Sequence, residues 1–186
     1  MLYYFDNRFP RLLWLALLSA LWCAQALALE PVRVGEGVYA FLGATGEPDR
    51  SNGGNTGNSG FIVARDGIVV IDTGPSFRHG RAMIAAIRRV SDKPIVLVVN
   101  THAVQEFLFG NAAFTRIGVP LLTHRASAQL MRERCAHCLD NLRLLLGEDA
   151  MRGTRLVVPP RLLGESAILR VAGRDLELLH FGWGAT

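Results

Sequence analysis

The chain has 186 residues, a formal net charge of +4 and a hydrophobic fraction of 50%. This length and composition are enough for one domain with a substantial core. The basic residues are nearly all arginines, with Lys93 as the single lysine, and they form no stripe interleaved with aromatic side chains. Nucleic-acid binding therefore has little support, and we expect no nucleic-acid partner.

The first 28 residues have the pattern of an export signal. Arg8 and Arg11 form a basic start, Leu12–Leu21 is an apolar run, and Ala26–Ala28 is a small-x-small cleavage site. The apolar run is short for a membrane span. We therefore expect a cleaved signal peptide over residues 1–28, no membrane span after cleavage, and a periplasmic or secreted protein. An uncleaved anchor is the alternative.

From residue 29 onward, β-rich runs predict two pairs of strands with a long loop between the pairs. The strands are expected at Val32–Val34, Val38–Leu42, Phe61–Ala64 and Ile68–Ile71. The loop covers Gly43–Gly60, which is dense in Gly, Asn and Ser. Asp66-Gly67, between the second pair of strands, is a strong hairpin signal.

Helices and strands then alternate along the chain. Apolar spacing predicts helices at Phe77–Val90, Gln105–Ile117 and Ala126–Leu146, and strands at Ile95–Val99, Val119–Thr123, Ile168–Val171 and Leu176–Leu179. The last two strands form a third hairpin. This order suits an α/β chain whose mixed sheet is covered by helices on one side.

Cys135 and Cys138 lie inside the third predicted helix. Residues three apart on a helix are close enough for a local disulfide, and an exported chain meets an oxidising compartment. We expect this pair to be oxidised. A c-type haem site is disfavoured because Leu139 stands where a His is needed. A metal site that uses both cysteines and His137 is an alternative.

Four segments carry a family resemblance: Gly60–Val63, Val69–Gly74, Asn100–Asn111 and Leu178–Thr186. They resemble the metallo-β-lactamase-fold hydrolases, and most narrowly their exported members associated with quinoprotein dehydrogenase systems. The resemblance implies an αβ/βα sandwich fold, zinc as the cofactor, and hydrolysis of an ester, thioester or amide-like bond in a small-molecule substrate. It also implies a periplasmic quinoprotein as a partner.

In that family the central motif is Thr-His-x-His-x-Asp-His, and zinc needs three protein ligands with one open position. His102 matches the first His, whereas Val104 replaces the second and Phe107 the last. Glu106 takes the place of the Asp. The resemblance therefore leaves His102 and Glu106 as candidate metal ligands, with Glu106 also the candidate catalytic acid or base.

These residues also have structural interpretations. His102 at a strand end suits a hydrogen-bonded structural histidine, and Glu106 near a helix start is favoured by the helix dipole. Asp72 in the family holds the turn and the site loops by hydrogen bonds. His124 and His180 stand at strand ends and are further candidate ligands.

The end of the chain lacks a ligand too. Members of the family have a Gly-x-Gly-His-Thr-like turn after a strand, and here Ala185 holds the His position. The family normally continues beyond this point, so we expect the domain over residues 29–186 to be incomplete at its C-terminus.

Two functions remain open, and whether the chain is an enzyme is not decided by its sequence. One is an exported hydrolase-like protein with a degenerate zinc site, linked to periplasmic quinoprotein-dependent oxidation. The other is a non-catalytic binding or accessory protein that keeps the fold without metal. A third reading is an incomplete reading frame.

Overall fold

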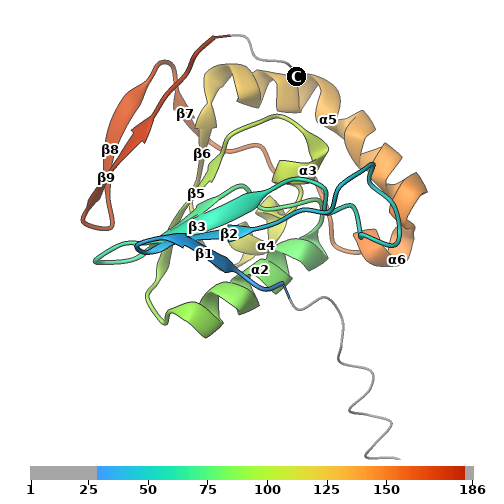
Figure 1. Ribbon diagram of the computed structural model, residues 1–186. Coiled ribbons are helices and arrows are strands. Elements are labelled where there is room, and N and C mark those ends of the chain that lie inside the picture. The colour runs from blue at the N-terminus through green and yellow to red at the C-terminus, as the bar shows by residue number, and fades with distance from the viewer. Residues whose placement is uncertain (1–28, 183–186) are drawn as a thin grey trace, which may run out of the picture.

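The computed structural model describes residues 29–182, so the expected signal peptide over residues 1–28 and the turn that contains Ala185 lie outside the described residues. The strands are β1 (Val32–Gly35), β2 (Val38–Phe41), β3 (Ser59–Val63), β4 (Ile68–Ile71), β5 (Ile95–Asn100), β6 (Leu121–His124), β7 (Arg161–Leu163), β8 (Ala167–Val171) and β9 (Arg174–Leu178). The helices are α2 (Phe77–Val90), α3 (Gln105–Leu108), α4 (Asn111–Arg116), α5 (Arg125–Leu146) and α6 (Glu148–Met151) (Figure 1).

Seven strands form one sheet in the order β1 to β7, and β8 and β9 form a separate hairpin. Strands β1 to β4 pair antiparallel, and β4 to β7 pair parallel. The Asp66-Gly67 hairpin was predicted correctly, because Val63 pairs with Ile68 across it. The mixed strand directions expected from the order of elements are confirmed.

Helix α2 has the bounds that its apolar spacing predicted. Ser76 caps its start, because the Ser76 Oγ accepts a hydrogen bond from the His79 N–H at 3.1 Å. Met83 and Ile87 lie on one face and are fully buried. This helix therefore stays in place through burial of one apolar stripe against the sheet.

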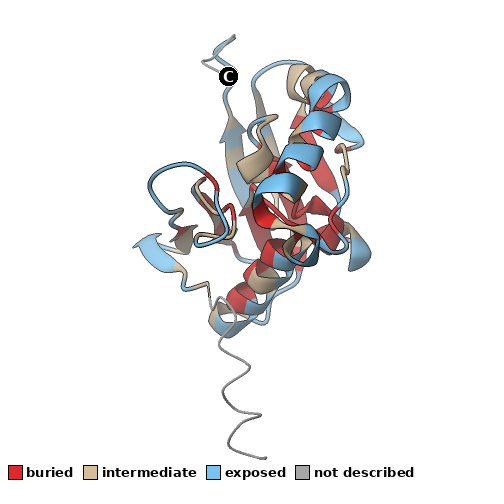
Figure 2. Ribbon diagram, turned by 90° about the vertical axis from the view of Figure 1, so that its right-hand side faces the viewer, coloured by how far each residue is buried: buried red, intermediate tan, exposed pale blue. Residues whose placement is uncertain are grey.

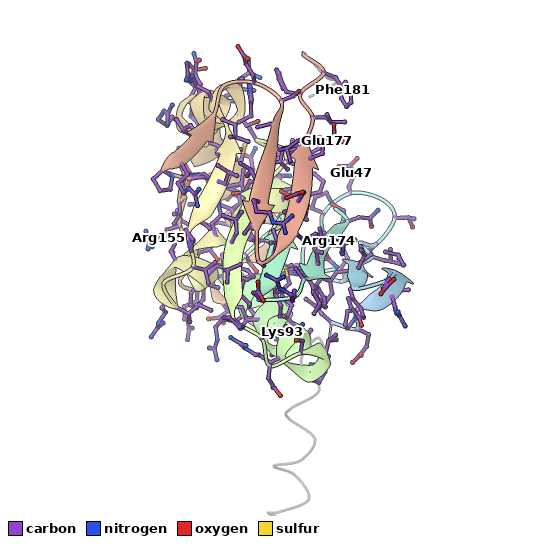
Figure 3. The ribbon with its side chains drawn as sticks, turned by 90° about the vertical axis from the view of Figure 1, so that its left-hand side faces the viewer. Glu47, Lys93, Arg155, Arg174, Glu177 and Phe181 are labelled. Carbon is purple, nitrogen blue, oxygen red and sulfur yellow. The ribbon has the colours of Figure 1, made fainter. Side chains whose placement is uncertain are left out.

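The two faces of the sheet are covered by different elements. On one face α2 and α4 cover a core that includes Phe41, Phe61, Ile68, Met83 and Phe114. On the other face the β8–β9 hairpin covers Val69, Leu97, Val99 and Leu122. Figure 3 shows this hairpin in front of the sheet, with Arg174 at its turn. Figure 2 shows buried residues in the sheet and exposed residues on the outer turns of the helices.

The third covering element is α5, which packs against α3 and α6 rather than over the middle of the sheet. Its contacts form a separate cluster with Leu108, Phe109, Met131, Leu142 and Met151. Within the described range, no helix combines the length and the apolar character that a membrane crossing needs.

The structure corrects one predicted helix. The helix expected over Gln105–Ile117 is two short helices with a break at Phe109 and Gly110. The reason is hydrogen bonding to another segment. The Gly110 N–H donates to the Gly74 carbonyl oxygen at 3.0 Å, and the Phe107 carbonyl oxygen accepts from the Thr73 N–H at 2.8 Å, so neither group extends the helical ladder. Helix α6 and strand β7 were not predicted.

The expected disulfide is also wrong, because Cys135 and Cys138 are both free thiols. The Cys135 Sγ donates to the Ala103 carbonyl oxygen and the Cys138 Sγ to the Arg134 carbonyl oxygen, each at 3.6 Å. Burial raises the pKa of Cys135 to about 12, with the neighbouring Cys138 as a further cause. Cys135 is therefore a buried, protonated thiol that packs in the core under α5.

Candidate functional site

The residues of the two motifs meet where β4 and β5 end side by side. Asp72 follows β4 in the left-handed region, with φ of 59°. Its N–H donates to the Val99 carbonyl oxygen at 2.9 Å, and its carboxylate accepts from both the N–H and the hydroxyl of Thr101. The structural role implied for Asp72 fits this geometry, because one carboxylate joins the loops after both strands.

Burial sets the charge state of this carboxyl group. Asp72 is 3% exposed, and this burial raises its pKa to about 6, although the hydrogen bonds from Thr101 oppose the rise. Around neutral pH the carboxylate is mainly ionised and accepts both hydrogen bonds.

The same hydroxyl reaches His102. The Thr101 Oγ1 lies 2.6 Å from the His102 Nδ1. A hydroxyl has one hydrogen, and the ionised Asp72 accepts it, so the Nδ1–H of His102 donates to Thr101. The Nε2 of His102 then carries the lone pair. The side chain is exposed, and its ring lies 5.3 Å from the ring of Phe107, centroid to centroid.

A network of buried side-chain amides connects the end of strand β5 to the start of helix α4. The Asn111 Nδ2 donates to the Asn100 Oδ1 at 2.7 Å and to the Val157 carbonyl oxygen at 3.0 Å. The Thr73 hydroxyl donates to the Asn111 Oδ1 at 2.9 Å, and the Thr73 N–H donates to the Phe107 carbonyl oxygen at 2.8 Å. Asn100, Asn111 and Thr73 therefore tie β4, β5 and the helix break into one unit.

Glu106 and Phe107 lie under the long β2–β3 loop. A Cβ on Gly57 would lie 2.6 Å from the Phe107 ring and 3.0 Å from the Glu106 Cβ. The Glu106 Oε1 accepts from Gln105, whereas its Oε2 is buried without a hydrogen-bond partner in the described structure. The loop that the sequence predicted thus covers two of the four positions aligned with metal ligands.

These side chains do not fit a zinc ion. Val104 and Phe107 have no donor atom, and the Phe107 ring packs beside His102 where the family has an imidazole. Among residues 29–182 no cluster of three or more His, Cys, Asp or Glu side chains has the arrangement of a metal site. One imidazole and one carboxylate fall short of the three protein ligands that zinc sites use.

His124 and His180 come together, but not as ligands. Their rings stack with centroids 3.7 Å apart. The His124 Nδ1 accepts from the Ala126 N–H, which caps α5, and its Nε2 lies 3.1 Å from the Gly164 carbonyl oxygen. Both nitrogens of His124 are therefore engaged. The two rings line a cavity of about 250 Å³ next to Thr101, together with Glu165 and Glu177.

Sequence reasoning missed the roles of Asn100, Asn111 and Phe107. The two asparagines stand at opposite ends of the motif, and their pairing depends on the turn between them, which no local pattern reveals. A signal was present in the buried position of Asn100 directly after an apolar strand, because a buried amide requires partners.

Comparisons with known proteins support the same fold. The sequence profile of the Metallo-beta-lactamase superfamily matches residues 52–128. A linear primary-alkylsulfatase from Pseudomonas sp. (strain ATCC 19151) is 40% identical over 54 residues, which are 29% of this chain and 10% of that protein.

Two solved structures share the arrangement of elements. A metallo-beta-lactamase from Pontibacter korlensis has a TM-score of 0.59 and 19% identity over 80% of this chain and 59% of its own. The metallo-beta-lactamase FIM-1 from Pseudomonas aeruginosa, in its mono-zinc form, has a TM-score of 0.57 and 15% identity over 79% of this chain and 56% of its own.

The chain thus spans little more than half of each solved structure and a tenth of the alkylsulfatase. At these identities the structural likeness shows the fold alone. The described chain therefore has the mixed α/β fold of the metallo-β-lactamases, and residues 52–128 are similar to the sequence profile of that superfamily.

Proposed function

We propose that this protein is a hydrolase-like member of the metallo-β-lactamase fold whose zinc site has degenerated, and that its retained scaffold binds a small molecule without zinc-dependent hydrolysis. The observation that carries the proposal is the Phe107 ring, which packs between His102 and the β2–β3 loop at Gly57. An apolar ring in a ligand position stabilises the loop by contact, whereas an imidazole there requires a metal or a polar partner.

The buried network supports the same proposal. Asp72 accepts hydrogen bonds from Thr101, and Asn111 donates to Asn100 and Val157, so these buried polar groups have protein partners without any ion. A scaffold that is complete in its own hydrogen bonds can keep the shape of the site after the ligands have changed.

Metal content tests the proposal. The purified chain is dialysed mildly against buffer with trace zinc, and the zinc content per chain is measured by inductively coupled plasma mass spectrometry. We expect well below one zinc per chain, with no change in His102→Ala. The double variant Val104→His/Phe107→His restores two imidazoles, so we expect its zinc content to rise. Near-stoichiometric zinc in the unchanged chain that disappears in His102→Ala would contradict the proposal.

A second candidate function has one observation in its favour. The Glu106 Oε2 is buried and has no hydrogen-bond partner in the described structure. A bound cation or a proton would stabilise such a carboxylate oxygen. In this alternative Glu106 and the free Nε2 of His102 hold a metal with further ligands, and Glu106 serves as acid or base. Glu106→Gln separates the two cases, because loss of bound metal and of esterase activity together would support the hydrolase.

The cellular setting is part of the proposal: export rests on the signal pattern of residues 1–28, and the quinoprotein partner rests on the resemblance. We place the chain in the periplasm or outside the cell, next to a quinoprotein that oxidises alcohols. Fractionation of cells that express the full chain tests export, and a shortened mature form in the periplasmic fraction would support it. Co-purification of a quinoprotein with that form, lost in a chain without residues 167–178, would support the partnership.

A further inference from the structure

A cavity of about 740 Å³ lies apart from the ligand positions, between the β2–β3 loop, the start of α2, the end of α4 and α6. Figure 1 shows the teal loop reaching across to α6 on the right-hand side. The Arg50 Nε donates to the Leu145 carbonyl oxygen there, which anchors the loop. Neither His102 nor any residue of Ala103–Phe107 lines this cavity.

Its lining is strongly basic. The charged side chains around it are five arginines and a single acid: Arg50, Arg78, Arg81, Arg116, Arg152 and Asp149. Asp149 pairs with Arg152, and the Arg116 guanidinium lies 5.9 Å from the centre of the Phe77 ring. Arg78 and Arg81 have no acidic partner within residues 29–182. The unbalanced charge therefore concentrates at the start of α2.

The start of α2 adds a donor to this charge. The Phe77 N–H donates to the Thr154 Oγ1 at 3.0 Å and the His79 N–H to the Ser76 Oγ, whereas the Arg78 N–H has no acceptor in the described structure. The first turn contains no acidic residue. The start of a helix favours negative charge, but the first turn of α2 carries the cationic side chain of Arg78. An anion bound there would relieve this repulsion and accept the free N–H.

His79 supplies an independent observation. Its side chain lines the same cavity and is 9% exposed, and its buried Nε2 has no hydrogen-bond partner in the described range. The ring lies so close to Gly74 that a Cβ there would meet the His79 Cδ2 at 2.0 Å. A buried ring nitrogen held in place without a partner is a group that a ligand can satisfy.

We propose that this cavity binds a small organic anion, with a phosphate or sulfate group at Arg78, Arg81 and the start of α2. Such a group offers three acceptor oxygens to two guanidinium groups and one backbone N–H. The apolar part of the ligand lies along Phe77, Ala82 and Ala85, which line the same space. The volume suits a ligand of ordinary small-molecule size.

The test is calorimetric titration of the intact chain with phenyl phosphate and phenyl sulfate. We expect saturable binding of at least one of them with a dissociation constant below about 1 mM. Phenol lacks the anion and should not bind. Which ester binds more tightly tells whether phosphate or sulfate is the preferred group.

Variants locate the site. Arg78→Gln/Arg81→Gln should weaken binding by about tenfold or more, whereas Arg132→Gln, an exposed arginine on α5, should leave it unchanged. Arg81→Lys keeps the charge and should retain part of the binding. In the unchanged chain, nuclear magnetic resonance should show a shift of the His79 ring signals on addition of the ester.

Three results would overturn the proposal. They are absence of saturable binding by either ester at millimolar concentration, equal weakening by Arg132→Gln, and equal binding of phenol. If Arg78→Gln/Arg81→Gln fails to fold, the Arg81→Lys titration and the His79 signals in the unchanged chain still decide the matter, because an unshifted His79 ring would place the anion elsewhere.

Discussion

Two sets of side chains share the segment Asn100–Asn111, one at its ends and one between them, and they differ in burial and in contacts. Asn100 and Asn111 at its ends are 2% and 0% exposed and hydrogen-bond to each other. His102 is exposed, and Val104 and Phe107 are half-buried and carry no polar atom. The first set ties the end of β5 to helix α4. In the second set, the Phe107 ring packs against His102 and against the loop at Gly57.

The difference teaches that the fold and the chemistry of this segment depend on separate residues. A change in a buried amide leaves several partners unsatisfied, whereas a change from His to Phe at a half-buried position can be absorbed by apolar contacts. Asp72 and Gly110-Asn111 match the resembling family, whereas only His102 does so among the four ligand positions. A sequence can therefore keep a strong signature of the fold after it has lost the ligands.

The most severe way to break the comparison is to remove the buried amide with Asn111→Ala. The Asn100 Oδ1 and the Val157 carbonyl oxygen lose the donor that Asn111 supplies, and the Thr73 hydroxyl keeps only its longer hydrogen bond to the Phe107 carbonyl oxygen, at 3.3 Å. With each buried unsatisfied group costing about 1–3 kcal/mol, we expect the free energy of unfolding to fall by about 4 kcal/mol. Chemical denaturation measures this change.

Asn58→Ala is the matched control, because Asn58 is an exposed loop asparagine that accepts one hydrogen bond from the Gly43 N–H. We expect a loss of about 0.5–1 kcal/mol for it. Similar losses for the two asparagines would mean that the network is not the main support of the site.

The buried Asp72 gives the comparison a pH dependence. Its pKa is about 6 in the folded protein, against 3.8 for the unperturbed group. The folded state holds the proton more tightly, so this contribution to stability is fully present below about pH 4 and is lost as the pH rises through 6. The loss is about 3 kcal/mol, because each pKa unit corresponds to about 1.4 kcal/mol.

Asp72→Asn provides the reference, since the amide does not titrate and its oxygen can still accept from the Thr101 N–H. The stability of the unchanged protein relative to this variant should therefore fall by about 3 kcal/mol between pH 4 and 7. His79, whose pKa burial lowers to about 4, is common to both proteins and cancels in the difference. A difference that does not vary with pH would show that Asp72 does not titrate in this range.

The contact of the loop with Phe107 can be sharpened by a double-variant cycle. In Gly57→Ala the new Cβ lies 2.6 Å from the Phe107 ring, so the ring or the loop must move, and we expect a loss of about 2 kcal/mol. In a Phe107→Ala background the space is open, and the same change should cost less than about 0.5 kcal/mol. Equal costs in both backgrounds would show that the loop does not rest on Phe107.

The sequence predicted much of the fold because its signals are local. The apolar stripe of α2 predicted the correct bounds of this helix, and Asp66-Gly67 predicted the hairpin. The break at Gly110 was missed because its cause is a pair of hydrogen bonds to Thr73 and Gly74, which lie far away in the chain. Strand β7 was missed because three residues with no alternating pattern carry too weak a signal.

The candidate site was predictable in part. The family motif, laid on this sequence, identified the four ligand positions as His102, Val104, Glu106 and Phe107. The residue types alone show that Val104 and Phe107 have no atom that can bind a metal. The packing of Phe107 against Gly57 depends on the path of the long β2–β3 loop over α3, and no local sequence pattern predicts that path. The arginine cavity was also hidden, because its residues come from four separate elements.

The smallest expected effect is at the one retained imidazole. His102 is exposed, hydrogen-bonds to Thr101 and touches one ring, so His102→Ala should change the free energy of unfolding by about 0.5 kcal/mol or less. This change in the free energy of unfolding is compared with that of Asn111→Ala, measured by the same chemical denaturation. If Asn111→Ala loses much more unfolding free energy than His102→Ala, the amide network stabilises the fold and His102 contributes little to stability. A loss above about 2 kcal/mol for His102→Ala would make the imidazole part of the scaffold, because an exposed side chain with one hydrogen bond cannot otherwise account for it.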